Sequence, residues 1–148
     1  MSVRELLRRK PEGVATVESR ASIAVAARRL IEHGVGGLAV VDVDGTLVGF
    51  MSERDIVRAV DRGRYFRELP VTYIMTRPAP TCAATAVIHH VMARMTRERV
   101  RHLVVLDTDE GRLCGVISVG DLVRHRLEHL ETETGVLRDY IAGQRAGG

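Results

Sequence analysis

The chain has 148 residues, of which 45% are hydrophobic and 28% charged, with a formal net charge of +3. This balance is typical of one compact domain or two tightly joined halves. No apolar run reaches the length of a membrane span, and residues 1–10 lack the apolar core of a signal peptide. Cys82 and Cys114 suggest neither a disulfide framework nor a zinc site and are expected as small core residues. We therefore expect a cytoplasmic protein.

The first half of the chain predicts two helices, two paired strands and a third helix. Residues 3–9 form a short amphipathic pattern that residues 11–13 end, and residues 14–17 are predicted to be extended. Residues 19–22 offer caps for the next helix. Its predicted buried stripe consists of Ile23, Ala26, Ala27, Leu30 and Ile31. Residues 38–43 and 46–51 are predicted strands around a turn, and Ser52 begins a helix through about Val60.

The second half returns to the same order. Residues 70–75 predict a short helix, residues 77–80 break it, and an extended piece follows near Thr81. The next helix has predicted inward positions at Val87, Val91, Met92 and Met95. Strands 103–106 and 113–117 precede a helix from Ser118. The charged residues from 125 onward predict a helical extension that Gly135 interrupts, packed on a second subunit or on its own chain, and residues 142–148 are predicted to be disordered.

An internal repeat explains this order. The segments Gly49-Phe-Met-Ser-Glu-Arg-Asp55 and Gly115-Val-Ile-Ser-Val-Gly-Asp121 lie 66 residues apart (115 − 49). A unit of about 45 to 60 residues is too small to bury a good core alone, so the two copies should pack into one domain. We assign residues 1–62 to the first unit with its N-terminal helix and 63–69 to the connection. Residues 70–126 form the second unit, and residues 127–148 form the helical extension and its disordered tail.

The duplicated β-α-β-β-α unit, with Gly-x-x-Ser-x-x-Asp opening its last helix, resembles the CBS domain pair, or Bateman module, over residues 3–125. It resembles the stand-alone bacterial proteins of this family, since no residues remain for a catalytic domain. The resemblance implies an α+β fold in which two units pack by their sheets around a pseudo-twofold axis. It also implies two clefts for adenosine ligands such as AMP, ADP, ATP, S-adenosylmethionine or NAD(H). We favour AMP as the ligand and energy sensing as the role, with no cofactor required.

The resemblance also implies the residues of each cleft. The first cleft would comprise Phe50, Ser52, Asp55, Ala79, Pro80, Val100, Arg101 and His102. The second would comprise Val14, Ala15, Val35, Gly36, Gly37, Val116, Ser118 and Asp121. In the family the motif Asp accepts hydrogen bonds from ribose hydroxyls, and the motif Ser or Thr donates one to phosphate. Ala15, Val35, Pro80 and Val100 would line the adenine slot.

The two predicted clefts differ in charge. Arg101-His102 occupies the position that the uncharged Gly36-Gly37 occupies in the other unit. We therefore expect the Asp55 cleft to be the better site for a phosphorylated nucleotide, although Arg54 and Lys10 could add charge. The Asp121 cleft would bind nucleoside, bind weakly or stay empty.

Other interpretations of these residues remain open. Each motif Ser, with Asp three residues later, could be only a helix cap, which would leave a scaffold dimer with vestigial clefts. The arginine content suggests nucleic-acid binding, but aromatic residues are only 3% of the chain. The pairs His89-His90 and His125/His129 are expected to be surface residues rather than metal ligands. The sequence shows no catalytic pattern. We expect a homodimer that acts on an unidentified effector protein, without contact to a membrane.

Overall fold

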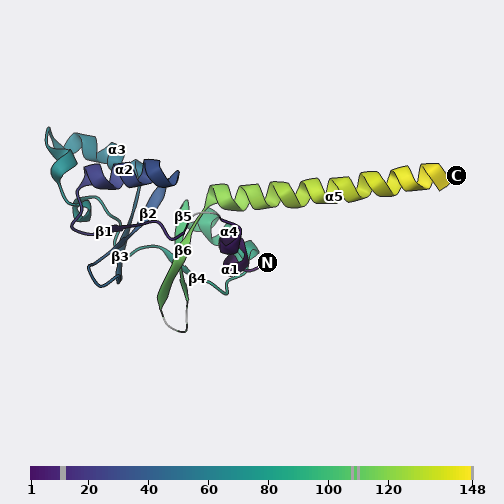
Figure 1. Cartoon of the computed structure of the whole chain (residues 1–148), viewed down its shortest axis with the longest axis horizontal. Coiled ribbons are helices and arrows are strands. Elements are labelled where there is room, and N and C mark those ends of the chain that lie inside the picture. Colours follow the sequence, from purple (N-terminus) through teal and green to yellow (C-terminus); the bar gives the residue numbers. More distant parts are fainter. Residues whose placement is uncertain (11–12, 108, 110, 148) are drawn as a thin grey trace.

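Two three-stranded sheets form the framework of the protein, in strand orders β1-β2-β3 and β4-β5-β6 (Figure 1). The structure is a computed structural model that describes residues 1–10, 13–107, 109 and 111–147. The strands are β1 (Thr16–Glu18), β2 (Gly37–Val41), β3 (Leu47–Ser52), β4 (Thr81–Ala83), β5 (His102–Asp107) and β6 (Arg112–Ser118). The α-helices are α1 (Val3–Arg8), α2 (Ile23–His33), α3 (Glu53–Ala59), α4 (Ile88–Glu98) and α5 (Val119–Gly147). Three 3₁₀ turns, η1 (Val60–Arg62), η2 (Phe66–Glu68) and η3 (Val71–Tyr73), connect the halves.

The two sheets repeat one topology, which confirms the predicted α+β fold. In each sheet the first strand runs parallel to the second, and the second runs antiparallel to the third. Both antiparallel pairs contain a register shift, between Val40 and Val41 in the first sheet and between Val105 and Leu106 in the second. These positions are 65 residues apart, the spacing of the strands in the repeat. The duplication in sequence is therefore a duplication in structure.

Local signals determine where the helices begin and which face they bury, with two differences from prediction. Ser22 caps α2 by accepting a hydrogen bond from the Val25 N–H, and Gly34 ends the helix in the left-handed conformation. Ile31, predicted to be buried, is 81% exposed because α2 packs through the faces of Ile23, Ala26 and Leu30. Val87, also predicted inward, is the exposed N-cap residue of α4, whose first buried residue is the next one along the chain.

The two sheets pack face to face through a third hydrophobic cluster. Ala39, Phe50 and Val104 form its buried centre, with Leu47, Ala79, Leu106, Leu113 and Val116 packed around them. Ala39 and Val104 are equivalent positions of the repeat, as are Phe50 and Val116. Each unit therefore presents the same positions to the other, which is the arrangement expected for two halves related by a pseudo-twofold axis.

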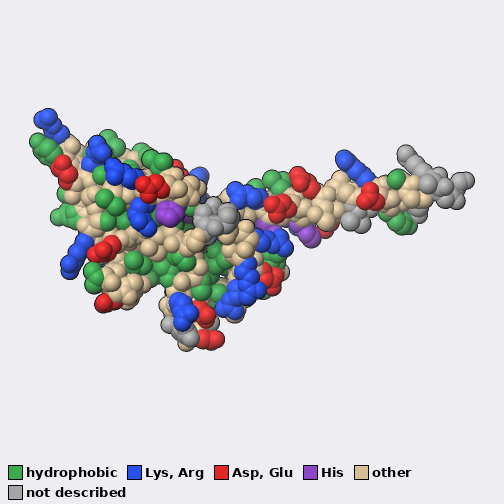
Figure 2. Space-filling view, in the orientation of Figure 1, with side chains coloured by type: hydrophobic (Ala, Val, Ile, Leu, Met, Phe, Trp, Pro, Cys, Tyr) green, Lys and Arg blue, Asp and Glu red, His purple; other side chains and the backbone are tan. Residues whose placement is uncertain are grey.

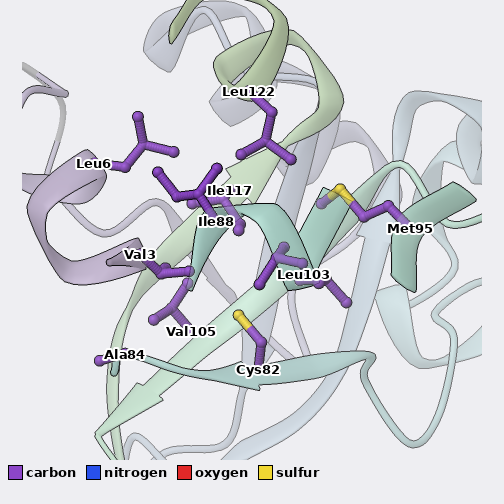
Figure 3. Close-up of a cluster of buried hydrophobic side chains, with 11 residues drawn as sticks. Val3, Leu6, Cys82, Ala84, Ile88, Met95, Leu103, Val105, Ile117 and Leu122 are labelled. Atoms are coloured by element: carbon purple, nitrogen blue, oxygen red, sulfur yellow. The ribbon is translucent and has the colours of Figure 1, made fainter. Parts of the chain in front are cut away.

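The first helical segment of each half packs on the other unit. Val3 and Leu6 of α1 lie in the core of the second unit, beside Ile88, Ile117 and Leu122 (Figure 3). The Val3 N–H also donates to the Ala86 carbonyl. Conversely, Val71 of η3 is completely buried in the core of the first unit, with Leu38 and Met51. The boundaries assigned from the repeat place α1 with the first unit along the chain, but in space it completes the second.

This exchange explains the glycine that opens each motif. A Cβ atom on Gly49 would lie 2.7 Å from the Met75 Sδ and 2.9 Å from the Thr76 carbonyl oxygen. A Cβ on Gly115 would lie 2.9 Å from a methyl group of Leu7 on α1. The exchanged segments cross the motif strands at these two points, and only glycine leaves room for them.

Helix α5 begins at the second motif and projects away from the sheets (Figure 1). It continues through Gly135 and to Gly147, whereas the sequence predicted an interruption and a disordered tail from Ala142. A glycine weakens a helix without breaking its hydrogen bonds, so the helix passes through Gly135. Gly148, and the predicted stop at Pro11 and Glu12, lie outside the described residues. None of the described helices is both long and apolar enough to cross a membrane.

Candidate functional site

Two neighbouring clefts lie where the motif helices meet the opposite unit. The Asp121 cleft has a volume of about 570 Å³, and the Asp55 cleft has a volume of about 430 Å³. Four residues line both clefts: Gly36, Glu53, Arg101 and His102. The clefts therefore adjoin at the loop before β2 and the start of β5, which are equivalent positions of the two units.

The structure brings most of the predicted site residues together. Every residue predicted for the Asp55 cleft lines it except Ala79, which packs between the two sheets. Every residue predicted for the Asp121 cleft lines it except Val14 and Ala15. Ala15 is buried in the core of the first unit, and Val14 is exposed outside the cleft lining.

In the Asp55 cleft, the motif Asp lies at the start of α3 and is only 8% exposed. Its Oδ2 accepts hydrogen bonds from the Ser52 N–H at 2.8 Å and from the Ser52 hydroxyl at 3.2 Å. Its Oδ1 lies 3.7 Å from the guanidinium of Arg58, whose side chain is 70% exposed. Ser52 and Asp55 form a capping box, so the capping role considered from the sequence is present. The capping contacts engage Oδ2, and Oδ1 meets only a distant, solvated arginine in this cleft.

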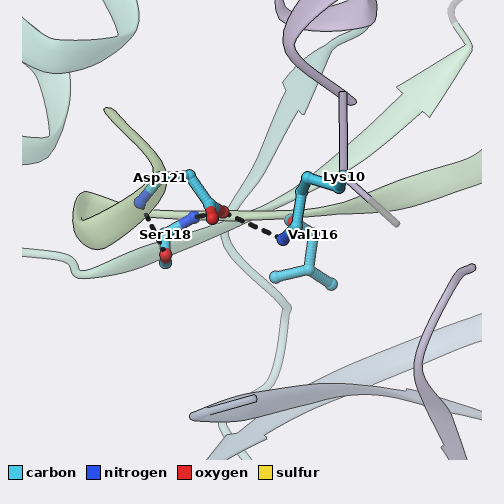
Figure 4. Close-up of polar contacts among 4 residues, drawn as sticks. All are labelled: Lys10, Val116, Ser118 and Asp121. Carbon is cyan, nitrogen blue, oxygen red and sulfur yellow. Dashed lines mark hydrogen bonds and ion pairs between the residues drawn. The ribbon is translucent and has the colours of Figure 1, made fainter. Parts of the chain in front are cut away.

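In the Asp121 cleft, the motif carboxylate has a close cationic partner (Figure 4). Lys10 Nζ donates to Asp121 Oδ2 and to the Val116 carbonyl, both at 2.9 Å. The Ser118 N–H donates to the same carboxylate oxygen at 2.9 Å, and the Asp121 N–H donates to the Ser118 hydroxyl at 3.1 Å. Lys10 follows α1, so the helix exchange brings this cation to the cleft.

The same contacts set the charge state of Asp121. Burial by itself raises the pKa of this carboxyl, because a charge is poorly solvated there. The hydrogen bonds from Lys10 and Ser118, with the charge of Lys10, outweigh burial and hold the pKa of Asp121 below its ordinary value. Asp121 is therefore an anion whose charge Lys10 already balances.

His102 lies at the junction of the two clefts. Its ring centroid is 5.2 Å from that of Phe50, and the rings are tilted by 38°. Burial lowers the pKa of His102, with the positive charges of Lys10 and Arg101 acting in the same direction. The carboxylates of Asp121 and Glu53 oppose the shift but do not cancel it. His102 is therefore neutral at neutral pH and becomes a cation more readily if an anion enters beside it.

The two clefts differ in their basic side chains. Four arginines line the Asp55 cleft together with two carboxylates: Arg54, Arg58, Arg99 and Arg101, with Glu53 and Asp55. Three basic residues line the Asp121 cleft, also with two carboxylates: Lys10, Arg101 and Arg124, with Glu53 and Asp121. Sequence reasoning missed Glu53, Arg58, Arg99 and Arg124, and it placed Arg101 and His102 in one cleft rather than both. The offset of 65 residues pairs Arg101 with Gly36, but only the fold shows that these positions adjoin.

The remaining candidates have structural explanations. Cys82 is buried, and burial raises the pKa of its thiol to about 11 despite the nearby Arg94, so it is a core residue as predicted. His125 and His129 stack with ring centroids 6.4 Å apart, and His129 lies 3.1 Å from Glu133. Within the described residues, no group of three or more His, Cys, Asp or Glu side chains could hold a metal ion.

Comparison with known proteins establishes the family. The model of the CBS domain matches residues 3–62 and 71–128, so the chain belongs to the CBS domain family as a tandem pair. It is close to stand-alone bacterial CBS-domain proteins. One of these, from Agrobacterium tumefaciens, is 38% identical with a TM-score of 0.77, over 84% of this chain and 92% of that one.

Two further structures of similar proteins contain adenosine compounds. A CBS domain protein from Pyrobaculum aerophilum, complexed with AMP, is 31% identical with a TM-score of 0.76, over 90% of this chain and 99% of that one. The CBS domain pair of protein MJ0100, in complex with 5′-methylthioadenosine and S-adenosyl-L-methionine, is 29% identical with a TM-score of 0.75. That similarity covers 87% of this chain and 98% of the other. Some curated relatives are much longer enzymes, of which this chain spans 22% to 34%, and their activities belong to those whole proteins.

Proposed function

We propose that this protein is a non-catalytic regulatory module that binds an adenosine-containing ligand, AMP above all, in the Asp55 cleft. The observation that carries the proposal is the polar geometry of that cleft. A buried carboxylate holds its helix start through Oδ2, while Oδ1 has only the solvated Arg58 nearby at 3.7 Å. Two structural relatives with bound adenosine compounds support the same ligand class.

The ribose and the phosphate would use different groups of this cleft. The Asp55 carboxylate can accept hydrogen bonds from both cis hydroxyls of a ribose, and its charge strengthens each bond. The Ser52 hydroxyl and the start of α3 suit an anion. Arg54, Arg99 and Arg101 line the same cleft and supply positive charge for a phosphate. Pro80 and Val100 provide apolar surface for the adenine ring.

The Asp121 cleft is the weaker site in this proposal. A ribose there would compete with Lys10, which already donates to Asp121 at 2.9 Å. Breaking a close pair whose side chains are 19% and 11% exposed costs more than displacing a solvated arginine. The cleft would bind a nucleoside or a weakly held nucleotide.

Binding would act on a partner through a change in the CBS pair. The clefts lie between the two units, so a ligand can stabilise one arrangement of the units over another. Helix α5 begins with Asp121 and Arg124 in one cleft and then leaves the globular part, which makes it the candidate output element. We also propose a homodimer that signals to an effector protein.

A scaffold function with vestigial clefts is the second candidate. It is favoured by the Ser52–Asp55 capping box, because capping alone accounts for both residues. Nucleic-acid binding has less support, since Phe50, which lines the Asp55 cleft, is buried rather than presented as a stacking surface.

A thermal-shift panel distinguishes the proposals. The ligands are AMP, ADP, ATP, NAD, NADH and S-adenosylmethionine, each over a concentration series. A ligand at one hundred times its dissociation constant stabilises the folded state by about 2.7 kcal/mol, which raises Tm by several degrees for a chain of this size. We expect the clearest shift with AMP. If no compound in the panel raises Tm, the scaffold function replaces the sensor function.

A further inference from the structure

Helix α5 carries an apolar stripe with the spacing of a coiled coil. Leu127, Leu130, Thr134, Leu137 and Ile141 follow one another at intervals of three, four, three and four residues. These are successive a and d positions of a heptad repeat, which fall on one side of a helix. The four apolar residues of this stripe are between 40% and 58% exposed. We call these five residues the α5 seam.

The globular part of the protein leaves the seam uncovered. The helix projects away from the sheets (Figure 1), and hydrophobic side chains lie among charged ones along it (Figure 2). Gly135 and Gly143 lie within this stretch, and glycine is a poor helix former. Most of the stability of a protein helix comes from packing of an amphipathic face. The projecting part of α5 is thus a helix that gains its stability from a partner.

The charges beside the seam identify that partner. Arg126 and Glu133 occupy g positions, and Glu131 and Arg138 occupy e positions. All four side chains are exposed. In a parallel, in-register pair, Arg126 would face the partner's Glu131, and Glu133 would face the partner's Arg138. Every one of these contacts joins opposite charges, so the seam is complementary to itself.

We propose that α5 pairs with α5 of a second copy of this chain as a parallel, in-register, two-stranded coiled coil. Thr134 fixes the orientation. A parallel register places Thr134 against the partner's Thr134, so the two polar side chains share one layer. An antiparallel alignment with the same charge pairing would place Thr134 against the partner's Leu130, within the apolar layers. A polar residue at an a position specifies register in this way.

Disulfide cross-linking at Thr134 tests the register. The full-length chain carries Thr134→Cys in a background with Cys82→Ala and Cys114→Ala, so that one thiol remains. Mild oxidation is expected to join two chains into a covalent dimer, because a-position residues face each other across a parallel coil.

Charge exchange tests whether the seam itself brings the chains together. Adding Arg126→Glu and Arg138→Glu makes all four flanking charges negative, and adding Glu131→Arg and Glu133→Arg makes them all positive. In either variant four attractive contacts become repulsive, and the Thr134→Cys cross-linking yield at low protein concentration should fall by about tenfold or more. An equimolar mixture of the two variants should restore the yield, now as a heterodimer.

The control variant carries Glu128→Arg and Asp139→Arg, which change charges on the outer face of α5 and should leave the yield unaltered. Circular dichroism of every variant verifies that the globular part remains folded. The proposal is overturned if Thr134→Cys gives no covalent dimer, or if the mixture fails to restore the yield. Cross-links between Leu127→Cys chains and Leu137→Cys chains, without cross-links through Thr134→Cys, would show an antiparallel pair and also overturn it.

Discussion

At the scale of single residues, the two motif carboxylates differ in their cationic partners. Lys10 and Asp121 are nearly buried and 2.9 Å apart, whereas Arg58 is exposed and 3.7 Å from Asp55. Exposed ion pairs contribute little to stability, but removal of one member of a buried pair leaves a charge without compensation. Equivalent positions of the repeat therefore make unequal contributions to stability.

We predict that Lys10→Met lowers the free energy of unfolding by about 1 to 3 kcal/mol at neutral pH. The pKa of Asp121 is held below its ordinary value in the folded protein, so its contribution is present above the ordinary Asp pKa and is lost as the pH falls. The difference between the two proteins should therefore shrink in acid. Urea unfolding at several pH values measures it. Arg58→Met is the matched control and should change stability little; an equal loss from both variants would refute this distinction.

The pKa of His102 makes ligand binding depend on pH. Burial lowers that pKa, so the unliganded protein holds His102 neutral at neutral pH. A bound phosphate favours the imidazolium, so binding takes up a proton, and AMP affinity should gain from a fall in pH. The phosphate itself titrates near pH 6, so the informative quantity is the affinity ratio between wild type and His102→Gln. We predict that this ratio rises between about pH 8 and pH 6. A constant ratio would show that His102 does not respond to the ligand.

At the scale of elements, the exchanged segments explain why each motif begins with glycine. We predict that Gly49→Ala destabilises the protein more than Gly115→Ala, by about 1 to 3 kcal/mol in chemical denaturation. The new Cβ at position 49 meets the backbone oxygen of Thr76, which pairs with the neighbouring strand residue. At position 115 it meets only the end of the Leu7 side chain, which can move. A larger loss at Gly115 would mean that α1 is held more rigidly than η3 and its following residues.

At the scale of the whole molecule, the repeat predicted most of the fold. The two motifs, their strands and the turn between them recur at a fixed offset, and the structure confirms two equivalent units. The family resemblance then indicated which residues gather in each cleft, because Ser52 and Asp55 or Ser118 and Asp121 occupy fixed places at a helix start. Local periodicity was less reliable. It placed Ile31 in the core, although the position lies at the edge of an amphipathic stripe where only tertiary packing decides burial.

What the sequence could not show is how the two units are joined in space. A repeat identifies equivalent segments but not the unit on which each one packs, so the crossing of α1 onto the second unit was not visible. The crossing places Lys10 beside Asp121 and makes the two clefts unequal. Arg101 lines both clefts, so a change at Arg101 cannot distinguish them. Arg54 and Arg124 each line one of the two and serve that purpose.

The central claim is that adenosine ligands bind at the Asp55 cleft, and a calorimetric titration with AMP tests it most directly. The proteins compared are wild type, Asp55→Asn and Asp121→Asn, since asparagine retains an acceptor for the helix cap while removing the charge. We predict that Asp55→Asn weakens AMP binding by about tenfold or more, whereas Asp121→Asn leaves the tighter site intact. Loss of AMP binding in Asp121→Asn alone would assign the ligand to the other cleft. Absence of AMP binding by wild type would contradict the account.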